Sequence, residues 1–232
     1  NQWALQGKLN FSKISYGVLP LVLNNYVLLN SGGALGKGVG PLLIAKDAFE
    51  MADLGNRSIA IPGKNTTAHL LFSLAFPNAV NKQFMVFHKI EEAVLSSRVD
   101  AGVIIHENRF TYQDKGLKKI IDLGEYWEQK LNVPIPLGGI IANRKMNAEL
   151  IVKVDRLIKK SLEFAFTNYP LITDYVKLHS QEMSEAVMKQ HIDLYVNNYS
   201  LALGDDGKKA VLKLIEVYQQ IHSENKLIET EI

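Results

Sequence analysis

One stretch decides how the chain is read: Val99-Asp100-Ala101-Gly102-Val103-Ile104-Ile105-His106-Glu107-Asn108-Arg109-Phe110-Thr111-Tyr112. Its first half is short, apolar and rich in β-branched side chains, which predicts a buried strand over 101–105. Titratable side chains follow directly, beginning with His106 and Glu107. In open α/β sheets, ligands bind beyond the carboxyl ends of the strands. The hypothesis is therefore that His106 is a catalytic base at the mouth of a cleft, although a histidine in this place more often caps or braces a loop.

Composition narrows the possible classes of protein. The chain has 232 residues, 47% of them hydrophobic and 22% charged, which suits one large domain or two small lobes. A net charge of +2 gives no strong field, so we expect neither nucleic acid nor a membrane as a partner. The absence of cysteine excludes disulfides, thiolate metal sites and a cysteine nucleophile. No basic-then-apolar leader is visible, and the expected location is cytoplasmic.

Apolar patterns predict alternating strands and helices followed by a helical tail. The predicted strands are 11–15, 26–29, 41–45, 57–61, 83–87, 101–105, 117–122 and 137–142. The predicted helices are 47–54, 68–75, 88–97, 124–131, 148–166, 169–179, 184–195 and 206–222. Such alternation favours mainly parallel sheets. The run 133–136 reads as a rigid connector because it contains two prolines.

Two of these strands, 41–45 and 138–142, bracket a middle section with its own strands and helices. We therefore predict two lobes joined by a two-strand hinge, with the ligand cleft between them. Residues 1–42 and 143–232 would form the first lobe, and residues 43–142 the second. The opening residues up to Gly7 read as the end of a helix, so a further amino-terminal portion is expected ahead of Asn1.

Two loops are candidate ligand contacts. The glycine-dense run 30–41 lacks the spacing of a phosphate loop or a dinucleotide fingerprint, and it is either a ligand-facing loop or a flexible connector. Thr66 and Thr67 stand where helix caps belong, at a helix start that would also suit an anion. The histidines at 179, 191 and 222 lie on amphipathic helices without metal-ligand spacing, and they read as surface or packing residues.

Five motifs occur in order along the chain: Ser31-Gly32-Gly33-Ala34-Leu35-Gly36-Lys37-Gly38-Val39-Gly40-Pro41, Pro62-Gly63-Lys64-Asn65-Thr66-Thr67-Ala68, Ile104-Ile105-His106-Glu107-Asn108-Arg109-Phe110-Thr111-Tyr112, Asp122-Leu123-Gly124-Glu125-Tyr126-Trp127-Glu128 and Pro136-Leu137-Gly138-Gly139-Ile140. Together they resemble the 1,4-dihydroxy-6-naphthoate synthases of the futalosine route to menaquinone. The resemblance runs along nearly the whole chain. It implies an α/β fold like that of type II periplasmic solute-binding proteins, with two lobes, a two-strand hinge and C-terminal helices, used here as a lyase. It also implies a strand–helix–strand portion ahead of Asn1.

The resemblance assigns roles to particular residues. It implies that His106 is the base that starts the conversion of cyclic dehypoxanthine futalosine to 1,4-dihydroxy-6-naphthoate. The substrate contacts that it implies are Ser15, Ser31, Gly32, Gly33, Thr67 and Ala68. From the residues themselves we add Thr66, and also Arg109, which could pair with the substrate carboxylate or orient Glu107.

The resemblance implies no metal and no organic cofactor. The substrate is the one expected partner, and the oligomeric state stays open. One alternative is a non-catalytic solute-binding protein of the same fold. A second is chorismate dehydratase of the same pathway, which the motif at His106-Glu107 disfavours.

Overall fold

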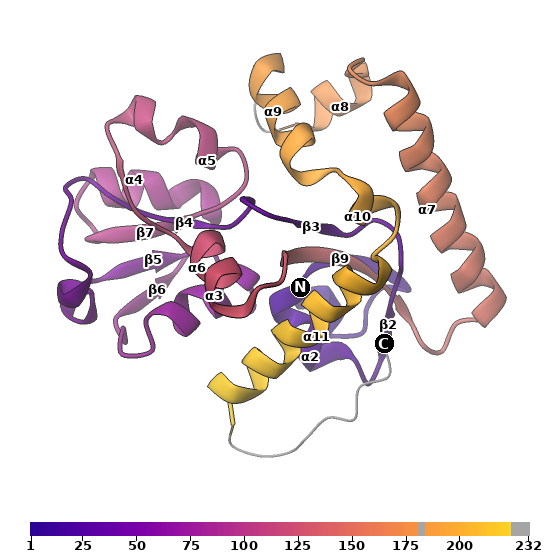
Figure 1. Cartoon of the computed structure of the whole chain (residues 1–232), viewed down its shortest axis with the longest axis horizontal. Coiled ribbons are helices and arrows are strands. Elements are labelled where there is room, and N and C mark those ends of the chain that lie inside the picture. Colours follow the sequence, from indigo (N-terminus) through magenta and orange to yellow (C-terminus); the bar gives the residue numbers. More distant parts are fainter. Residues whose placement is uncertain (181–183, 224–232) are drawn as a thin grey trace.

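The computed structural model describes residues 1–180 and 184–223 and contains two β-sheets (Figure 1). The first sheet has the order β1-β9-β2, with β3 also paired to β9. Its strands are β1 (Phe11–Ser15), β2 (Tyr26–Leu28), β3 (Ala34–Gly36) and β9 (Ile135–Asn143). The second sheet has the order β6-β5-β7-β4-β8. Its strands are β4 (Leu42–Ala45), β5 (Ile59–Ile61), β6 (Lys82–Phe84), β7 (Ala101–Ile104) and β8 (Lys118–Asp122).

The prediction of mainly parallel sheets was wrong. β9 is antiparallel to β1, β2 and β3, and β4 is antiparallel to β7 and β8. Among the described residues, the two parallel pairs are β5 with β6 and β5 with β7. The prediction of a rigid connector over 133–136 was also wrong for its second half, because Ile135 and Pro136 belong to β9. Pro136 pairs where the register with β3 shifts, a place that tolerates a missing backbone donor.

The helices are α1 (Gln2–Leu5), α2 (Leu19–Val22), α3 (Thr67–Ala75), α4 (Ile90–Leu95), α5 (Asn108–Thr111), α6 (Leu123–Leu131), α7 (Ala148–Asn168), α8 (Asp174–His179), α9 (Glu185–Tyr195), α10 (Asn198–Leu201) and α11 (Gly204–Ile221). Short 3₁₀ turns are η1 (Tyr16–Val18), η2 (Met51–Asn56), η3 (Phe87–Lys89) and η4 (Gln113–Lys115). The predicted helix 169–179 begins only at Asp174, because Thr173 caps it by accepting a hydrogen bond from Val176 N–H. Within the described ranges, no helix is both long and apolar enough to span a membrane.

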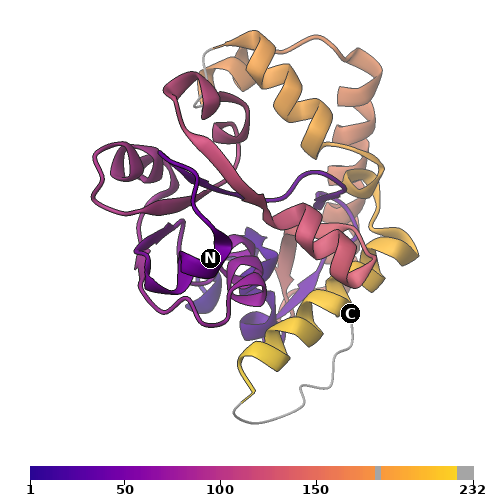
Figure 2. The same ribbon diagram turned by 60° about the vertical axis from the view of Figure 1, so that its left-hand side comes forward.

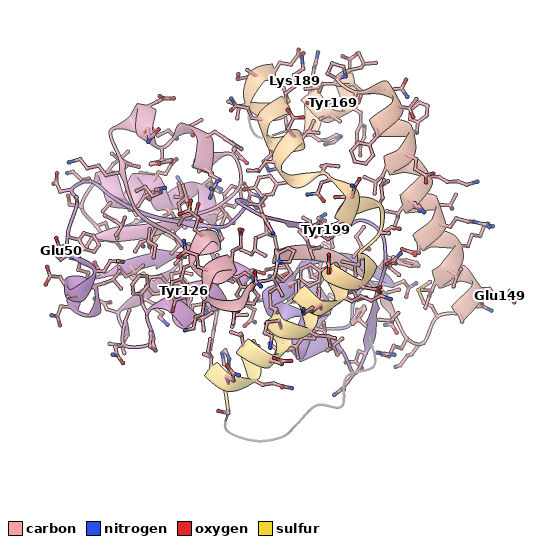
Figure 3. All side chains as sticks on the ribbon, viewed as in Figure 1. Glu50, Tyr126, Glu149, Tyr169, Lys189 and Tyr199 are labelled. Atoms are coloured by element: carbon pink, nitrogen blue, oxygen red, sulfur yellow. The ribbon has the colours of Figure 1, made fainter. Side chains whose placement is uncertain are left out.

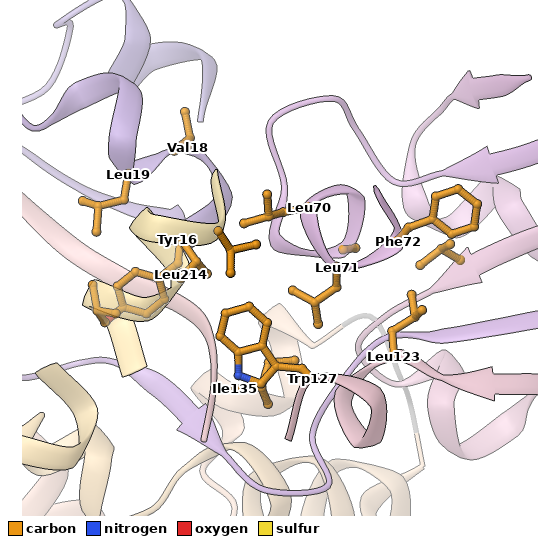
Figure 4. Close-up of a cluster of buried hydrophobic side chains, with 14 of the residues drawn as sticks. Tyr16, Val18, Leu19, Leu70, Leu71, Phe72, Leu123, Trp127, Ile135 and Leu214 are labelled. Carbon is orange, nitrogen blue, oxygen red and sulfur yellow. The ribbon is translucent and has the colours of Figure 1, made fainter. Parts of the chain in front are cut away.

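The main core joins the two sheets. Trp127 of α6, Tyr16 of η1, Leu71 of α3 and Leu214 of α11 are buried together beside β9 (Figure 4). Burial of apolar area on this scale is the main stabilising term in folding, at roughly 25 cal/mol per Å². The Trp127 indole N–H also donates to the carbonyl of Pro134 at 3.1 Å, which ties α6 to the segment that enters β9.

Two backbone segments meet between the sheets. A Cβ on Gly40 would lie 2.2 Å from the Cα of Gly124, so only glycine allows this close approach. Gly40 lies between β3 and β4, and Gly124 is the second residue of α6, which directly follows β8. The crossing segments are thus held backbone to backbone. The predicted lobe boundaries at 42/43 and 142/143 stay a prediction.

The first three helices after β9 form a separate group, whereas α11 packs on the main core. α7, α8 and α9 lie together at one end of the molecule, and α11 runs along another side (Figure 2). α7 has no buried residue, and Glu149 points outward from its first turn (Figure 3). α9 comes back from this group toward the middle of the molecule (Figure 1).

Candidate active site

A cavity of about 760 Å³ lies where the two sheets, the start of α3 and the helices α7 and α9 meet. Seven predicted site residues line it: Ser15, Gly32, Gly33, Thr66, Thr67, Ala68 and His106. The cavity is also lined by residues that were not predicted from the sequence, among them Asn1, Lys13, Tyr195 and His191. Lys13 shares a strand face with Ser15, since residues two apart in a strand point to the same side, and that spacing is the signal that could have found it.

His106 stands in the turn between β7 and α5. Its backbone φ is +58°, a left-handed conformation that is uncommon for a residue other than glycine and costs on the order of 1–3 kcal/mol. The turn is closed by a hydrogen bond of 3.2 Å from Arg109 N–H to the His106 carbonyl. Phe87 packs edge-on against the imidazole, with 5.2 Å between ring centroids. This turn aims the ring into the cavity.

The surroundings of His106 favour its neutral form. His106 is exposed to the cavity, but the protein atoms around its ring reduce its solvation and lower its pKa below the ordinary value; the Glu107 carboxylate opposes this shift and the positive charge of Lys13 adds to it. The ring keeps solvent access through the cavity, which it lines. A neutral imidazole near neutral pH can accept a proton, and His106 therefore has the form that a general base needs.

A second imidazole faces His106 from α9. The ring of His191 lies 6.2 Å from that of His106, centroid to centroid, and 4.5 Å from the ring of Tyr195. The prediction of a surface or packing role for His191 did not foresee that its side chain also lines the cavity. Met188, His191 and Tyr195 lie on one face of α9, and Met188 is buried. That helical spacing was the available signal.

Three potential metal-ligating side chains lie close together here, and two of them, His106 and His191, line the cavity. His106, Glu107 and His191 each offer one potential ligand atom, and these atoms lie within 4.8 Å of one another. A metal ion could use such a set, since histidine and carboxylate are common ligands. The same three groups also suit acid–base chemistry without a metal.

Another part of the cavity lining consists of Ser15, Thr66, Thr67 and Ala68. Thr67 N–H donates to Ser15 Oγ at 2.7 Å, and Thr67 Oγ1 donates to the carbonyl of Leu137 at 3.1 Å. Thr66 caps α3 by accepting from His69 N–H at 3.1 Å. Among residues 1–180 and 184–223, Ala68 N–H has no hydrogen-bond partner, so this donor at the start of α3 is open to a ligand.

Ser31 and Arg109 lie outside the cavity lining. Ser31 is buried, its N–H donates to Asp155 of α7 at 2.8 Å, and its hydroxyl donates to the carbonyl of Leu201 at 3.0 Å. The guanidinium of Arg109 lies 2.6 Å from a carboxylate oxygen of Asp122. It also donates to the carbonyl of Gly40. Both residues hold together segments that border the cavity.

Comparison with known proteins places the chain among characterised relatives. A family model described as menaquinone biosynthesis matches residues 1–220. The 1,4-dihydroxy-6-naphthoate synthase of Streptomyces coelicolor is 44% identical over 220 residues, which are 93% of this chain and 77% of that protein.

Solved structures agree on the fold. The crystal structure of a protein from Archaeoglobus fulgidus matches with a TM-score of 0.88 and 32% identity, over 94% of this chain and 81% of that one. The ligand-binding component of an ABC-type import system from Staphylococcus aureus, solved with zinc bound, matches with a TM-score of 0.64 at 11% identity, over 94% and 77% of the two chains. The expected periplasmic-binding-protein-like α/β fold is thereby confirmed.

Proposed function

The chain belongs to the menaquinone biosynthesis family and is an enzyme similar to the 1,4-dihydroxy-6-naphthoate synthases, and from this premise we propose its substrate and its base. The substrate is cyclic dehypoxanthine futalosine, which the enzyme cleaves to 1,4-dihydroxy-6-naphthoate. His106 starts the reaction by removing a carbon-bound proton. The observation that carries this proposal is that His106, whose pKa is lowered, lines the same cavity as Thr67 and Ala68 at the open start of α3.

The two walls of the cavity suit the two ends of such a substrate. The aromatic carboxylate would bind at the start of α3, where Ala68 N–H and the helix dipole favour an anion. The carbon acid would then lie toward His106 at the other wall. Ser15 and Thr67 hold the start of α3 against β1, because their hydroxyls lie 3.0 Å apart and Thr67 N–H donates to Ser15. Their role is to fix the anion site in place.

Proton removal needs a neutral base that is held close to the substrate. The turn at φ +58° and the packing of Phe87 restrict the orientation of the His106 ring. Positioned general-base help of this kind contributes about 10²–10⁴ in rate. The proton passes from the substrate carbon to the free ring nitrogen, and the electron pair moves toward the adjacent electron-withdrawing centre.

The test of this proposal is a product assay on the purified protein. Given cyclic dehypoxanthine futalosine, it should form 1,4-dihydroxy-6-naphthoate, detected by mass and by chromatography against a standard. A protein that only binds cyclic dehypoxanthine futalosine would return the compound unchanged, and that result would overturn the proposed reaction. Chorismate offered to the same preparation tests the alternative that the protein is a chorismate dehydratase. Turnover of chorismate, without turnover of cyclic dehypoxanthine futalosine, would overturn the proposal.

A further inference from the structure

His191 is a second imidazole in the cavity, and the proposed mechanism gives it no role. α9 carries it into the cavity on the side of His106, at a ring separation of 6.2 Å. The reactive nitrogen atoms lie close enough for a single substrate group to contact both rings, since ligand atoms of His106, Glu107 and His191 lie within 4.8 Å of one another. The ring plane of His191 is supported by Tyr195, one helical turn away on α9.

Neither imidazole is held by a hydrogen bond within the described part of the chain. No ring nitrogen of His106 or His191 makes a hydrogen bond to a residue in 1–180 or 184–223. By contrast, His69 and His222 each place Nδ1 on a backbone carbonyl, at 2.6 Å and 2.9 Å. His69 and His222 show that this chain can place an imidazole nitrogen on a backbone carbonyl, whereas the partly buried His191 has no such partner among the described residues. The free nitrogens of His191 are thus available to a ligand in the cavity.

We propose that His191 is a second catalytic residue, which donates a hydrogen bond to the substrate oxygen that becomes negative when His106 removes the proton. This inference deepens the proposed function and rests on it. His191 takes the place of an oxyanion donor, a role that a neutral imidazole can fill because one ring nitrogen carries a proton. Burial and the nearby His106 lower the pKa of His191 and favour that neutral form.

The step balances without any further reactant. The carbon–hydrogen bond breaks, and its proton forms a bond to the free nitrogen of His106. The electron pair moves into the adjacent group, and the oxygen of that group gains negative charge. His191 keeps its own proton in a hydrogen bond that strengthens as this charge develops. The groups that face the pair are Glu107, Lys13 and Tyr195, and none of them has to lose or gain a proton.

The experiment compares His191→Phe, His191→Gln and the wild type in the product assay, with EDTA present to exclude bound metal. His191→Phe keeps a ring of similar size but no donor, and His191→Gln restores an N–H donor. His179→Phe is the matched control, because His179 is exposed on α8 and lies outside the cavity lining. Circular dichroism melting of every variant checks that it folds.

We expect His191→Phe to lower kcat by about 10²–10³, the effect of removing one oxyanion donor, with KM changed less than about fivefold. The kcat of His191→Gln should be at least tenfold higher than that of His191→Phe. The kcat of His179→Phe should equal that of the wild type. A kcat for folded His191→Phe within threefold of the wild type would overturn the inference while the proposed function stands. So would a loss that His191→Gln fails to relieve. No product from the wild type would overturn both.

Discussion

Arg109 offers a choice between two roles that one substitution can separate. Its guanidinium lies 2.6 Å from Asp122, whose side chain is 1% exposed, while that of Arg109 is 17% exposed. Arg109→Met keeps most of the apolar stem and removes the charge. Breaking a buried ion pair from one side costs about 3–5 kcal/mol, because the remaining charge is left without its partner.

The structure places the expected cost toward the lower end of that range. Asp122 also accepts hydrogen bonds from Gly124 N–H at 2.8 Å and Glu125 N–H at 3.2 Å, and these still stabilise the carboxylate. We therefore expect Arg109→Met to lower the free energy of unfolding by about 3 kcal/mol. Since domains have about 5–15 kcal/mol of stability, the variant should still fold.

The assay is urea unfolding followed by the fluorescence of tryptophan, since Trp127 is fully buried. Arg98→Met is the control, because Arg98 is an exposed arginine and its loss should change stability by no more than about 0.5 kcal/mol. In an Asp122→Asn background, Arg109→Met should cost clearly less, since no buried charge is left unpaired. An Arg109→Met protein as stable as the wild type but with a raised KM would refute this reasoning, and would assign the guanidinium to the substrate.

Two further predictions concern the cavity walls. Thr67→Val should lower stability by about 1–3 kcal/mol in thermal or urea unfolding, because the Thr67 hydroxyl accepts from Gly17 N–H and donates to Leu137; an unchanged stability would show that these bonds contribute nothing. In the presence of EDTA, kcat/KM should fall as the pH drops through an apparent pKa below that of an ordinary histidine, since loss of solvation lowers the pKa of His106 and only its neutral form accepts a proton. A profile that rises toward acid, or that stays flat down to the pH at which the protein unfolds, would contradict a histidine base.

Much of the fold was predictable because its strands are short apolar runs between turn residues. The predicted strand 11–15 matches β1 in full, and 101–105 exceeds β7 by one residue. β3 was missed because Ala34–Gly36 lies inside a glycine-dense run, and it forms only through pairing with β9. Strand direction was predicted wrongly because it depends on where long-range partners lie, and a local pattern contains no information about them.

The site divides in the same way. The position of His106 and of the start of α3 beside a cavity was predictable, since each follows a recognisable strand and carries its polar side chains in consecutive residues. His191 was misread because amphipathic spacing identifies the apolar face of a helix but does not tell what that face contacts. Arg109 was read as a ligand contact because its partner Asp122 lies 13 residues away and meets it only when β8 and α5 lie side by side.

The central claim is that His106 removes a proton from a substrate that is held in the cavity. The most direct measurement pairs turnover with binding in His106→Asn, a variant that keeps polarity but loses the basic nitrogen. If His106 is the base, product formation from cyclic dehypoxanthine futalosine should fall by at least about 10²-fold in this variant. The Kd from calorimetry should stay within a few fold of the wild type. Turnover of His106→Asn at the wild-type rate, or a loss explained wholly by weaker binding, would contradict it.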